Sequence, residues 1–402
     1  METPILSIVV PTKNRYRTLR VLIEAILNWK AQDFELIIQD NSVNNSEILE
    51  SIVGFRTDKR LKYFYEPKSL TLVENCELAI EKTNGEYICF IGDDDGLVEE
   101  TTEICKWLKA NEIESASFRK ASYLWPDVEE RLKGNSSLTG ILHIPLAKGK
   151  VQLVDSKKSL IKTLKRKGAQ HDYRNPAPYH GIVSKQCYLR LKRNAGRFFP
   201  GPTPDMSSAV GISLNVNKHV FIDWPLIISG TSLLSAGGMG MLGEHIGELE
   251  NVTSLPRETS DNWTPELPFY WSGPTINAES AIKALEGTNN KDLIKYVNFN
   301  RIYALCLMYI PSFRKRTILH VMELKRSRNP KVSYSKIFIE FMLISAERSN
   351  TLFTKVQHCI LGHFNDRNRI HCRDIGEAMV VLQTYVRNTG VLDSVITEKI
   401  EI

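Results

Sequence analysis

The stretch EYICFIGDDDG, residues 86–96, joins a short apolar run to three consecutive carboxylates, Asp93, Asp94 and Asp95. The apolar run has the length and composition of a buried β-strand, and the acidic residues follow where that strand should end. Adjacent carboxylates repel one another, and a hard divalent cation relieves that repulsion. The stretch therefore predicts a strand that ends in a metal-binding triplet, although a solvated acidic turn has the same local pattern.

The sequence before this stretch alternates between strand-like and helix-like segments. Short apolar runs occupy residues 5–10, 34–39 and 61–65, and segments with helical periodicity or helix signals separate them. Such alternation predicts an α/β fold with a Rossmann-like, mostly parallel sheet. In these sheets ligands bind beyond the carboxyl ends of the strands. The polar strand ends of this chain carry Pro11 and Thr12, Asp40, Lys68 and the triplet.

The rest of the chain changes character at about residue 275. Up to about residue 250, strand-like and helix-like segments alternate with loops rich in Gly and Pro, whereas helical periodicity dominates beyond residue 275. We therefore expect a ligand-binding domain over residues 1–250 and a C-terminal helical domain, an appendage to the sheet, over residues 275–402.

Composition limits the classes of partner. The 402 residues carry a formal net charge of +6 without the dense basic patterning of a nucleic-acid binder, so we expect no nucleic-acid partner. Seven cysteines without a CxxC pair argue against a zinc site or a disulfide framework and favour a reducing compartment. No signal-peptide pattern and no apolar run long enough to span a bilayer are present. These features predict a cytoplasmic protein.

A basic run at residues 156–167, SKKSLIKTLKRK, has two interpretations. It is either a solvated helix face or a contact with anionic lipid or with the diphosphate of a lipid-linked molecule. The second interpretation predicts peripheral contact with the inner face of a membrane.

Three motifs, in order, resemble those of the family 2 glycosyltransferases, which have the A-type glycosyltransferase fold. They are SIVVPTKNRYRTL at residues 7–19, FELIIQDNS at residues 34–42 and NGEYICFIGDDDGL at residues 84–97. The resemblance is close over residues 5–100 and loose over residues 101–250. The members that this chain resembles are those of bacterial surface-polysaccharide assembly. It implies an inverting transferase that moves a sugar from a nucleoside diphosphate sugar to a glycan or lipid-linked acceptor, with Mn²⁺ or Mg²⁺ as cofactor.

The resemblance also implies roles for the matching residues. Pro11 and Thr12 would lie against the base and ribose, and Asp40 would bind the base. Asp93 would hold the ribose and Asp94 or Asp95 the metal, but a run of three leaves the choice within it open. Further contacts to the nucleotide sugar are expected from Asn14, Arg15 and Lys68.

A base that deprotonates the acceptor hydroxyl is the remaining requirement of the implied reaction. Asp205 follows a proline-containing loop and opens a helix, where similar enzymes place this residue, although an N-cap role explains the same pattern. Glu99, Glu100 and Asp223 are weaker candidates, and His180 is expected near the acceptor.

His245 lies in a glycine-rich segment, residues 235–249, that similar enzymes close over the diphosphate. It is a candidate third metal ligand, although a lone histidine is more often structural.

Two other functions remain open. A nucleotidyltransferase of similar fold would need a glycine-rich phosphate loop soon after the first strand, and residues 11–19 contain no glycine. A catalytically silent module that binds a sugar or nucleotide would also have this fold, and only a measurement of activity separates it from an enzyme.

Overall fold

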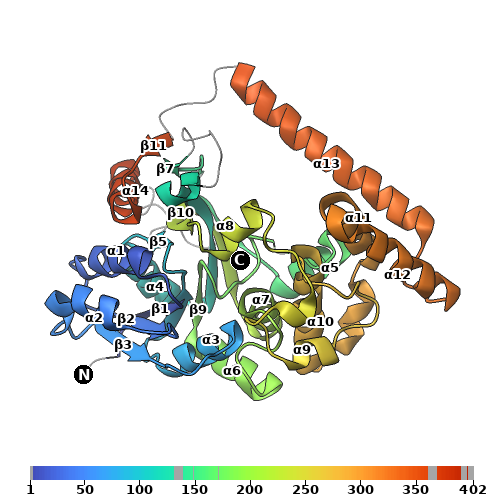
Figure 1. Ribbon diagram of the computed structural model, residues 1–402. Coiled ribbons are helices and arrows are strands. Elements are labelled where there is room, and N and C mark those ends of the chain that lie inside the picture. The colour runs from blue at the N-terminus through green and yellow to red at the C-terminus, as the bar shows by residue number, and fades with distance from the viewer. Residues whose placement is uncertain are drawn as a thin grey trace.

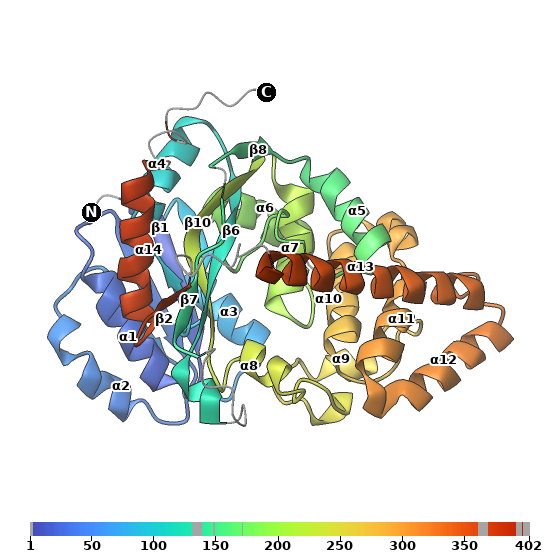
Figure 2. The same ribbon diagram turned by 90° about the horizontal axis from the view of Figure 1, so that it is seen from above.

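The computed structural model describes residues 3–130, 139–147, 149–170, 172–360, 369–390 and 396. A β-sheet runs through the N-terminal part of the molecule, and a group of helices lies to one side of it (Figures 1 and 2). Among the described residues, no helix combines the length and the apolar composition needed to cross a membrane.

The N-terminal strands form the parallel half of the sheet in the order β3-β2-β1-β4. Their bounds are β1 Leu6–Thr12, β2 Phe34–Asp40, β3 Leu61–Tyr65 and β4 Tyr87–Phe90. The crossovers contain α1 (Tyr16–Leu27), α2 (Ser46–Ser51) and α3 (Leu72–Glu81). Strands β1, β2 and β4 are buried along their whole length, which explains why they read as continuous apolar runs.

Beyond β4 the sheet becomes mixed. Strand β9 (Gly181–Ser184) lies antiparallel between β4 and β6 (Ser115–Leu124), and β6 pairs in parallel with the long strand β10 (His219–Thr231). The short strands β5 (Gly96–Leu97), β7 (Ile141–His143) and β8 (Val151–Leu153) pair antiparallel to β10, β6 and β10, respectively. The predicted α/β class is confirmed, with a parallel N-terminal half and these added antiparallel strands.

The remaining helices fall into two groups. Around the sheet lie α4 (Thr101–Ala110), α6 (Lys185–Ala195) and α8 (Ala236–Met241). The second group builds its own apolar core, which α5 and α7 share with the later helices. Its members are α5 (Ser156–Lys167), α7 (Pro204–Asn215), α9 (Glu258–Asp261), α10 (Gly273–Gly287), α11 (Phe299–Tyr309), α12 (Arg314–Arg326) and α13 (Tyr334–Ile360).

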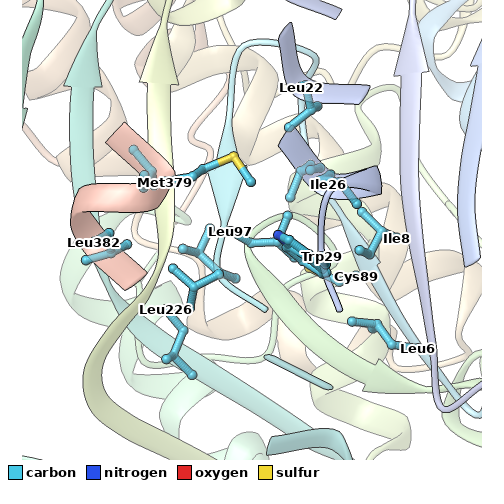
Figure 3. Close-up of a cluster of buried hydrophobic side chains, with 14 of the residues drawn as sticks. Leu6, Ile8, Leu22, Ile26, Trp29, Cys89, Leu97, Leu226, Met379 and Leu382 are labelled. Carbon is cyan, nitrogen blue, oxygen red and sulfur yellow. The ribbon is translucent and has the colours of Figure 1, made fainter. Parts of the chain in front are cut away.

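The end of the described chain returns to the sheet. Strand β11 (Arg369–His371) pairs antiparallel with β7, and α14 (Ile375–Thr389) packs against α1 and β10. Figure 3 shows Met379 and Leu382 of α14 beside Leu97 and Leu226 in the core of the sheet. A helical C-terminal region is therefore present, but β11 and α14 depart from the expectation that residues 275–402 form only an appendage. The division into two domains stays a prediction.

Candidate functional site

The acidic triplet lies immediately after β4, at the carboxyl end of the parallel half of the sheet. Because β4 pairs in register with β1, Asp93 comes next to Thr12 at the end of β1. The side chains are withdrawn from solvent, with exposed fractions of 0% for Asp93, 4% for Asp94 and 5% for Asp95. Buried carboxylates need partners, and each of the three has its own set.

Asp93 is held by the first turn of α1 and the end of β1. Its carboxylate accepts hydrogen bonds from Thr12 Oγ1 at 2.5 Å and Thr18 Oγ1 at 3.1 Å, and Arg15 Nε lies 3.0 Å from Oδ2. Burial raises the pKa of Asp93 to about 7, while the charge of Arg15 acts in the opposite direction. Arg15 is therefore the main compensating charge at this position.

Asp94 is held from the far end of β10. Its Oδ2 accepts hydrogen bonds from the backbone N–H and the hydroxyl of Ser232, both at 2.9 Å, and Arg15 Nη1 lies 3.5 Å from Oδ1. Burial, and next the charge of Asp95, raises the pKa of Asp94. A Cβ on Gly230 would lie 1.7 Å from the carbonyl oxygen of Asp94, so this close approach requires glycine.

Asp95 is the carboxylate with the strongest compensation. Its Oδ2 accepts hydrogen bonds from the Gly92 N–H at 2.6 Å and lies 2.7 Å from His180 Nε2, and its Oδ1 accepts from the Gly230 N–H at 2.8 Å. Burial alone would raise the pKa of Asp95, but His180 and the two backbone amides outweigh burial and lower it. His180 Nδ1 in turn faces Lys120 Nζ at 3.2 Å.

A cavity of about 540 Å³ opens beside the triplet. Its wall includes Arg15 and Ser232, which bind the triplet, as well as Asn14, Val43 and Asn44 from the ends of β1 and β2. This volume lies within the usual range for small-molecule sites of roughly 300–1,000 Å³. The cavity therefore lies where a ligand of the sheet is expected, with the acidic triplet behind its wall.

Two of the predicted nucleotide contacts are engaged within the protein. Asp40 is fully buried, and its carboxylate accepts four hydrogen bonds: two from Ser42, one from Tyr16 and one from Tyr63. Because a carboxylate offers about four acceptor positions, a base would have to replace one of these partners. Asn14 has a positive φ of 59° and accepts a hydrogen bond from the Val43 N–H, so it ties β1 to the loop after β2.

Two further predicted contacts, Pro11 and Lys68, lie outside the wall of the cavity. Pro11 is buried within β1, opposite Gln39 of β2. Lys68 is exposed on the loop after β3, and its carbonyl accepts a hydrogen bond from Asn41. Neither residue is among those that line the cavity. Their roles in binding stay predictions.

Asp205 is exposed at the second position of α7, and Thr203 rather than Asp205 is the N-cap. Among the described residues, no hydrogen bond or ion pair to the Asp205 carboxylate is found. Its negative charge nevertheless acts on Lys120 and on His245. The Asp205 carboxylate is therefore exposed and unpaired among the described residues, and it interacts electrostatically with Lys120, which in turn lies beside His180.

The weaker candidates for the base have structural partners. Glu99 accepts a hydrogen bond from the Ala31 N–H at 2.6 Å, and Glu100 pairs with Arg387 of α14. Asp223 pairs with Arg119 on the neighbouring strand.

His245 packs against an aromatic ring, with 4.1 Å between the ring centroids of His245 and Trp271. The glycine-rich segment that contains His245 begins with the short helix α8, and Ser235 caps this helix by accepting a hydrogen bond from the Gly238 N–H at 3.1 Å. Within the described residues, no group of three or more His, Cys, Asp or Glu side chains is gathered as a metal cage. His245 as a metal ligand stays a prediction.

The triplet can bind a divalent cation through Asp94 and Asp95 without a third protein ligand. Among the described residues, Arg15 at 3.5 Å is the one partner of Asp94 Oδ1, and Asp95 Oδ1 accepts one hydrogen bond, so both oxygens keep acceptor capacity. Mg²⁺ typically binds one or two protein carboxylates together with phosphate oxygens of a ligand. The donor set therefore suits a cation that arrives with a phosphate group.

Sequence reasoning missed three residues of this site: Lys120, Ser232 and Gly230. Lys120 carries one usable signal, since it is a charged residue inside the strand-like run SASFRKASYL at residues 115–124. Ser232 and Gly230 lie more than 130 residues from the triplet in sequence, and only the pairing of β10 with β5 and β6 brings them close.

Comparison with known proteins finds similarity to glycosyltransferases in the N-terminal segment. Residues 7–117 match the family described as glycosyl transferase family 2. An uncharacterized glycosyltransferase of Haemophilus influenzae is 34% identical over 105 residues, which cover 26% of this chain and 41% of that protein. A GalNAc(5)-diNAcBac-PP-undecaprenol beta-1,3-glucosyltransferase of Campylobacter jejuni is 34% identical over 98 residues, which cover 24% of this chain and 31% of that protein. The chain thus spans less than half the length of these curated relatives.

A solved structure is similar over a longer part of the chain, but its sequence identity is lower. TarS residues 1–349 of S. aureus, in complex with UDP-GlcNAc, has a TM-score of 0.43 and 16% identity, covering 82% of this chain and 93% of that one. At this level the likeness carries no information on the ligands of the present chain.

Proposed function

We propose that this chain, whose residues 7–117 match the family described as glycosyl transferase family 2, transfers a sugar from a nucleoside diphosphate sugar to a hydroxyl group of an acceptor. The observation that carries this proposal is the buried triplet beside a cavity at the carboxyl end of the parallel strands. Arg15 and Ser232 contact both the triplet and the cavity, which supports binding of the donor there.

A divalent cation, Mn²⁺ or Mg²⁺, would be held by Asp94 and Asp95 and would neutralise charge on the diphosphate as it leaves. The protein itself supplies the remaining electrostatics. Arg15 pairs with Asp93 and Asp94, and His180 hydrogen-bonds to Asp95, so each buried carboxylate has a partner within the protein.

Asp205 is proposed as the general base. Its carboxylate is exposed and free of partners among the described residues, so it can accept the proton of an acceptor hydroxyl. A direct attack by that hydroxyl on the anomeric carbon, opposite the diphosphate, inverts the anomeric centre. No second carboxylate nucleophile is then required.

The acceptor is proposed to be a glycan or a lipid-linked glycan of bacterial polysaccharide assembly. The support is the Campylobacter jejuni relative, whose name specifies an undecaprenol-linked acceptor, and the net positive charge of this chain. A cytoplasmic location with peripheral membrane contact is part of the same proposal.

A thermal-shift screen of UDP, GDP and their sugar conjugates, with and without Mn²⁺, tests the function. A ligand that binds the folded state raises its melting temperature by mass action. We expect a metal-dependent rise with one base. No rise with any nucleotide, at concentrations up to about a hundred times a micromolar Kd, would contradict the proposal.

A further inference from the structure

Helix α13 presents an apolar surface to solvent along its described part. Tyr334, Phe338 and Met342 recur at a spacing of four residues and share one face, with Ile339 and Leu343 beside them. Their exposed fractions run from 49% for Leu343 to 66% for Phe338. In Figure 1 α13 runs along the outer edge of the helical region, and in Figure 2, seen from above, it crosses in front of the other helices.

The opposite face of α13 accounts for its packing. Ile337 and Ile344 are buried, and Glu340 and Glu347 form ion pairs with Arg301 of α11. At 3.6 residues per turn, all four charged residues between positions 334 and 349 fall on this inner half of the helix. The outer half is therefore uncharged, and its apolar residues are not needed to attach α13 to the protein.

Helix α12 continues this surface with positive charge. Ile318, Leu319 and Met322 are exposed, and Lys315 and Lys325 lie on the same side of the helix. The two helices meet where the Lys325 ammonium lies 6.0 Å from the centroid of the Tyr334 ring. We call the exposed residues of both helices the α12–α13 surface.

The charge around this surface is one-sided. Residues 314–336 contain eight Lys or Arg and one Glu, a net charge of +7 in a chain whose total is +6. Two of the basic residues, Arg316 and Lys331, are neutralised by Glu248 and Glu266, and most of the rest are exposed. The partner that fits must therefore bury apolar side chains and supply negative charge.

We propose that the α12–α13 surface docks on a lipid bilayer that contains anionic headgroups. Apolar and aromatic side chains enter the boundary between headgroups and acyl chains, while the lysines and arginines beside them contact the headgroup phosphates. A second copy of this chain fits less well, because a two-fold contact through this surface would bring the basic residues of α12 against themselves. The inference rests on the proposed function in one respect: a lipid-linked acceptor would be located in the bilayer on which the α12–α13 surface docks.

Co-sedimentation of the full chain with vesicles tests the proposal without any nucleotide or metal. One vesicle is phosphatidylcholine alone, and in the other about a third of the lipid is phosphatidylglycerol. We expect binding to the anionic vesicle that weakens as salt is added. No binding to it would overturn the proposal, and this readout is indifferent to whether the chain transfers sugar.

The apolar contribution is tested by the double variant Phe338→Ser, Met342→Ser. The matched control, Leu146→Ser with Val380→Ser, removes two exposed apolar side chains elsewhere. We expect the first variant to lower the partition coefficient more than about tenfold, because burial of one such side chain contributes that much or more, and the control to bind as wild type. Equal losses in both variants would overturn the assignment to this surface.

The charge contribution is tested by Lys315→Glu, Lys325→Glu, Arg326→Glu. Its control reverses three exposed lysines of α5, Lys157, Lys158 and Lys162, which belong to the basic run at residues 156–167. Loss of binding only in the α12 variant supports the proposal, and loss only in the α5 variant overturns it. Light scattering adds a further check: a wild-type dimer that Phe338→Ser, Met342→Ser dissociates would show that a second copy occupies the surface.

Discussion

The acidic triplet and the α12–α13 surface hold opposite charges in opposite environments. Asp93, Asp94 and Asp95 are almost fully buried, and each has a charged or hydrogen-bonding partner in or directly next to β1, α1, β9 or β10. On α12 and α13, large apolar side chains are exposed, and most of the basic residues around them form no ion pair within the part of the chain that the structure describes. The first arrangement suits a small charged ligand held by a rigid sheet edge, and the second suits an extended partner.

This contrast predicts how substitutions should differ. In the triplet, partners are interdependent, so a single change leaves a buried charge without compensation. On α13, Phe338 and Met342 are exposed opposite the packed face, so changes there should leave stability nearly untouched and act only on a partner. The predictions below test this difference, from the largest expected effect to the smallest.

Asp205→Asn should reduce turnover by about 100- to 10,000-fold, because it removes the proposed base while keeping the size of the side chain. Steady-state kinetics with the donor found by thermal shift would measure the loss. Donor affinity and melting temperature should stay near wild type, since Asp205 has no described partner and Thr203 is the N-cap. Asp223→Asn is the control for a carboxylate already paired with Arg119. Turnover above about a tenth of wild type in Asp205→Asn would remove this residue from the mechanism.

Arg15→Gln should lower the free energy of unfolding by about 3–5 kcal/mol, because Asp93 and Asp94 lose their shared positive charge in a buried position. Urea unfolding at pH 8, where burial no longer keeps Asp93 protonated, is the measurement. Lys106→Gln breaks an exposed ion pair with Asp33 and should cost no more than about 1 kcal/mol. Equal costs for the two variants would contradict the compensating role of Arg15.

His219 should make the protein acid-sensitive. Burial lowers its pKa to about 4, so the folded protein keeps it neutral, whereas the unfolded chain binds a proton near the ordinary value of about 6.5. The contribution of neutral His219 to the free energy of unfolding is therefore fully present above pH 6.5. It is lost as the pH falls towards 4, by up to about 3 kcal/mol.

Urea unfolding of His219→Gln at pH 7 and pH 4.5 measures this contribution, with the exposed His371→Gln as control. The pH dependence should become shallower in His219→Gln alone. An unchanged slope would show that other groups cause the acid sensitivity.

Phe338→Ser should change the free energy of unfolding by no more than about 0.5 kcal/mol, because the side chain is 66% exposed and lies opposite the packed face of α13. Ile337→Ser, one residue away on the inner face, should destabilise by more than about 2 kcal/mol. Thermal unfolding of the two variants would measure the difference. A similar loss in both would show that the outer face of α13 packs within the protein.

Sequence patterns predicted the parallel half of the sheet because its signals are local. Strands β1, β2 and β4 are apolar runs with polar ends, and the amphipathic crossover helices between them need no distant information. The antiparallel strands and the return of α14 were not predictable in this way. The spacing of Ile375, Met379 and Leu382 shows that one face of α14 is buried, but it does not say that α1 and β10 cover that face.

The residues of the site likewise fall into those that local motifs predicted and those that only the three-dimensional fold brings in. The triplet and Arg15 each lie in a motif that the sequence shows by itself, and the structure brings Arg15 within 3.0 Å of Asp93 and 3.5 Å of Asp94. Ser232, Gly230 and His180 reach the triplet only through the strand order, which periodicity does not reveal. The hydrogen bonds from Tyr16 and Tyr63 to Asp40 were equally hidden, because the two tyrosines belong to different elements.

The most direct test of the central claim is calorimetric titration of the full chain with the preferred nucleoside diphosphate and Mn²⁺. The titration compares wild type with the variant Asp94→Ala, Asp95→Ala and with the control Glu103→Gln, Asp261→Asn, which changes two exposed acidic side chains on α4 and α9. We expect metal-dependent binding by wild type and control, and none by the triplet variant, provided its circular dichroism spectrum remains that of a folded protein. Unchanged metal-dependent binding by the folded triplet variant would contradict the account, because the nucleotide would then bind elsewhere.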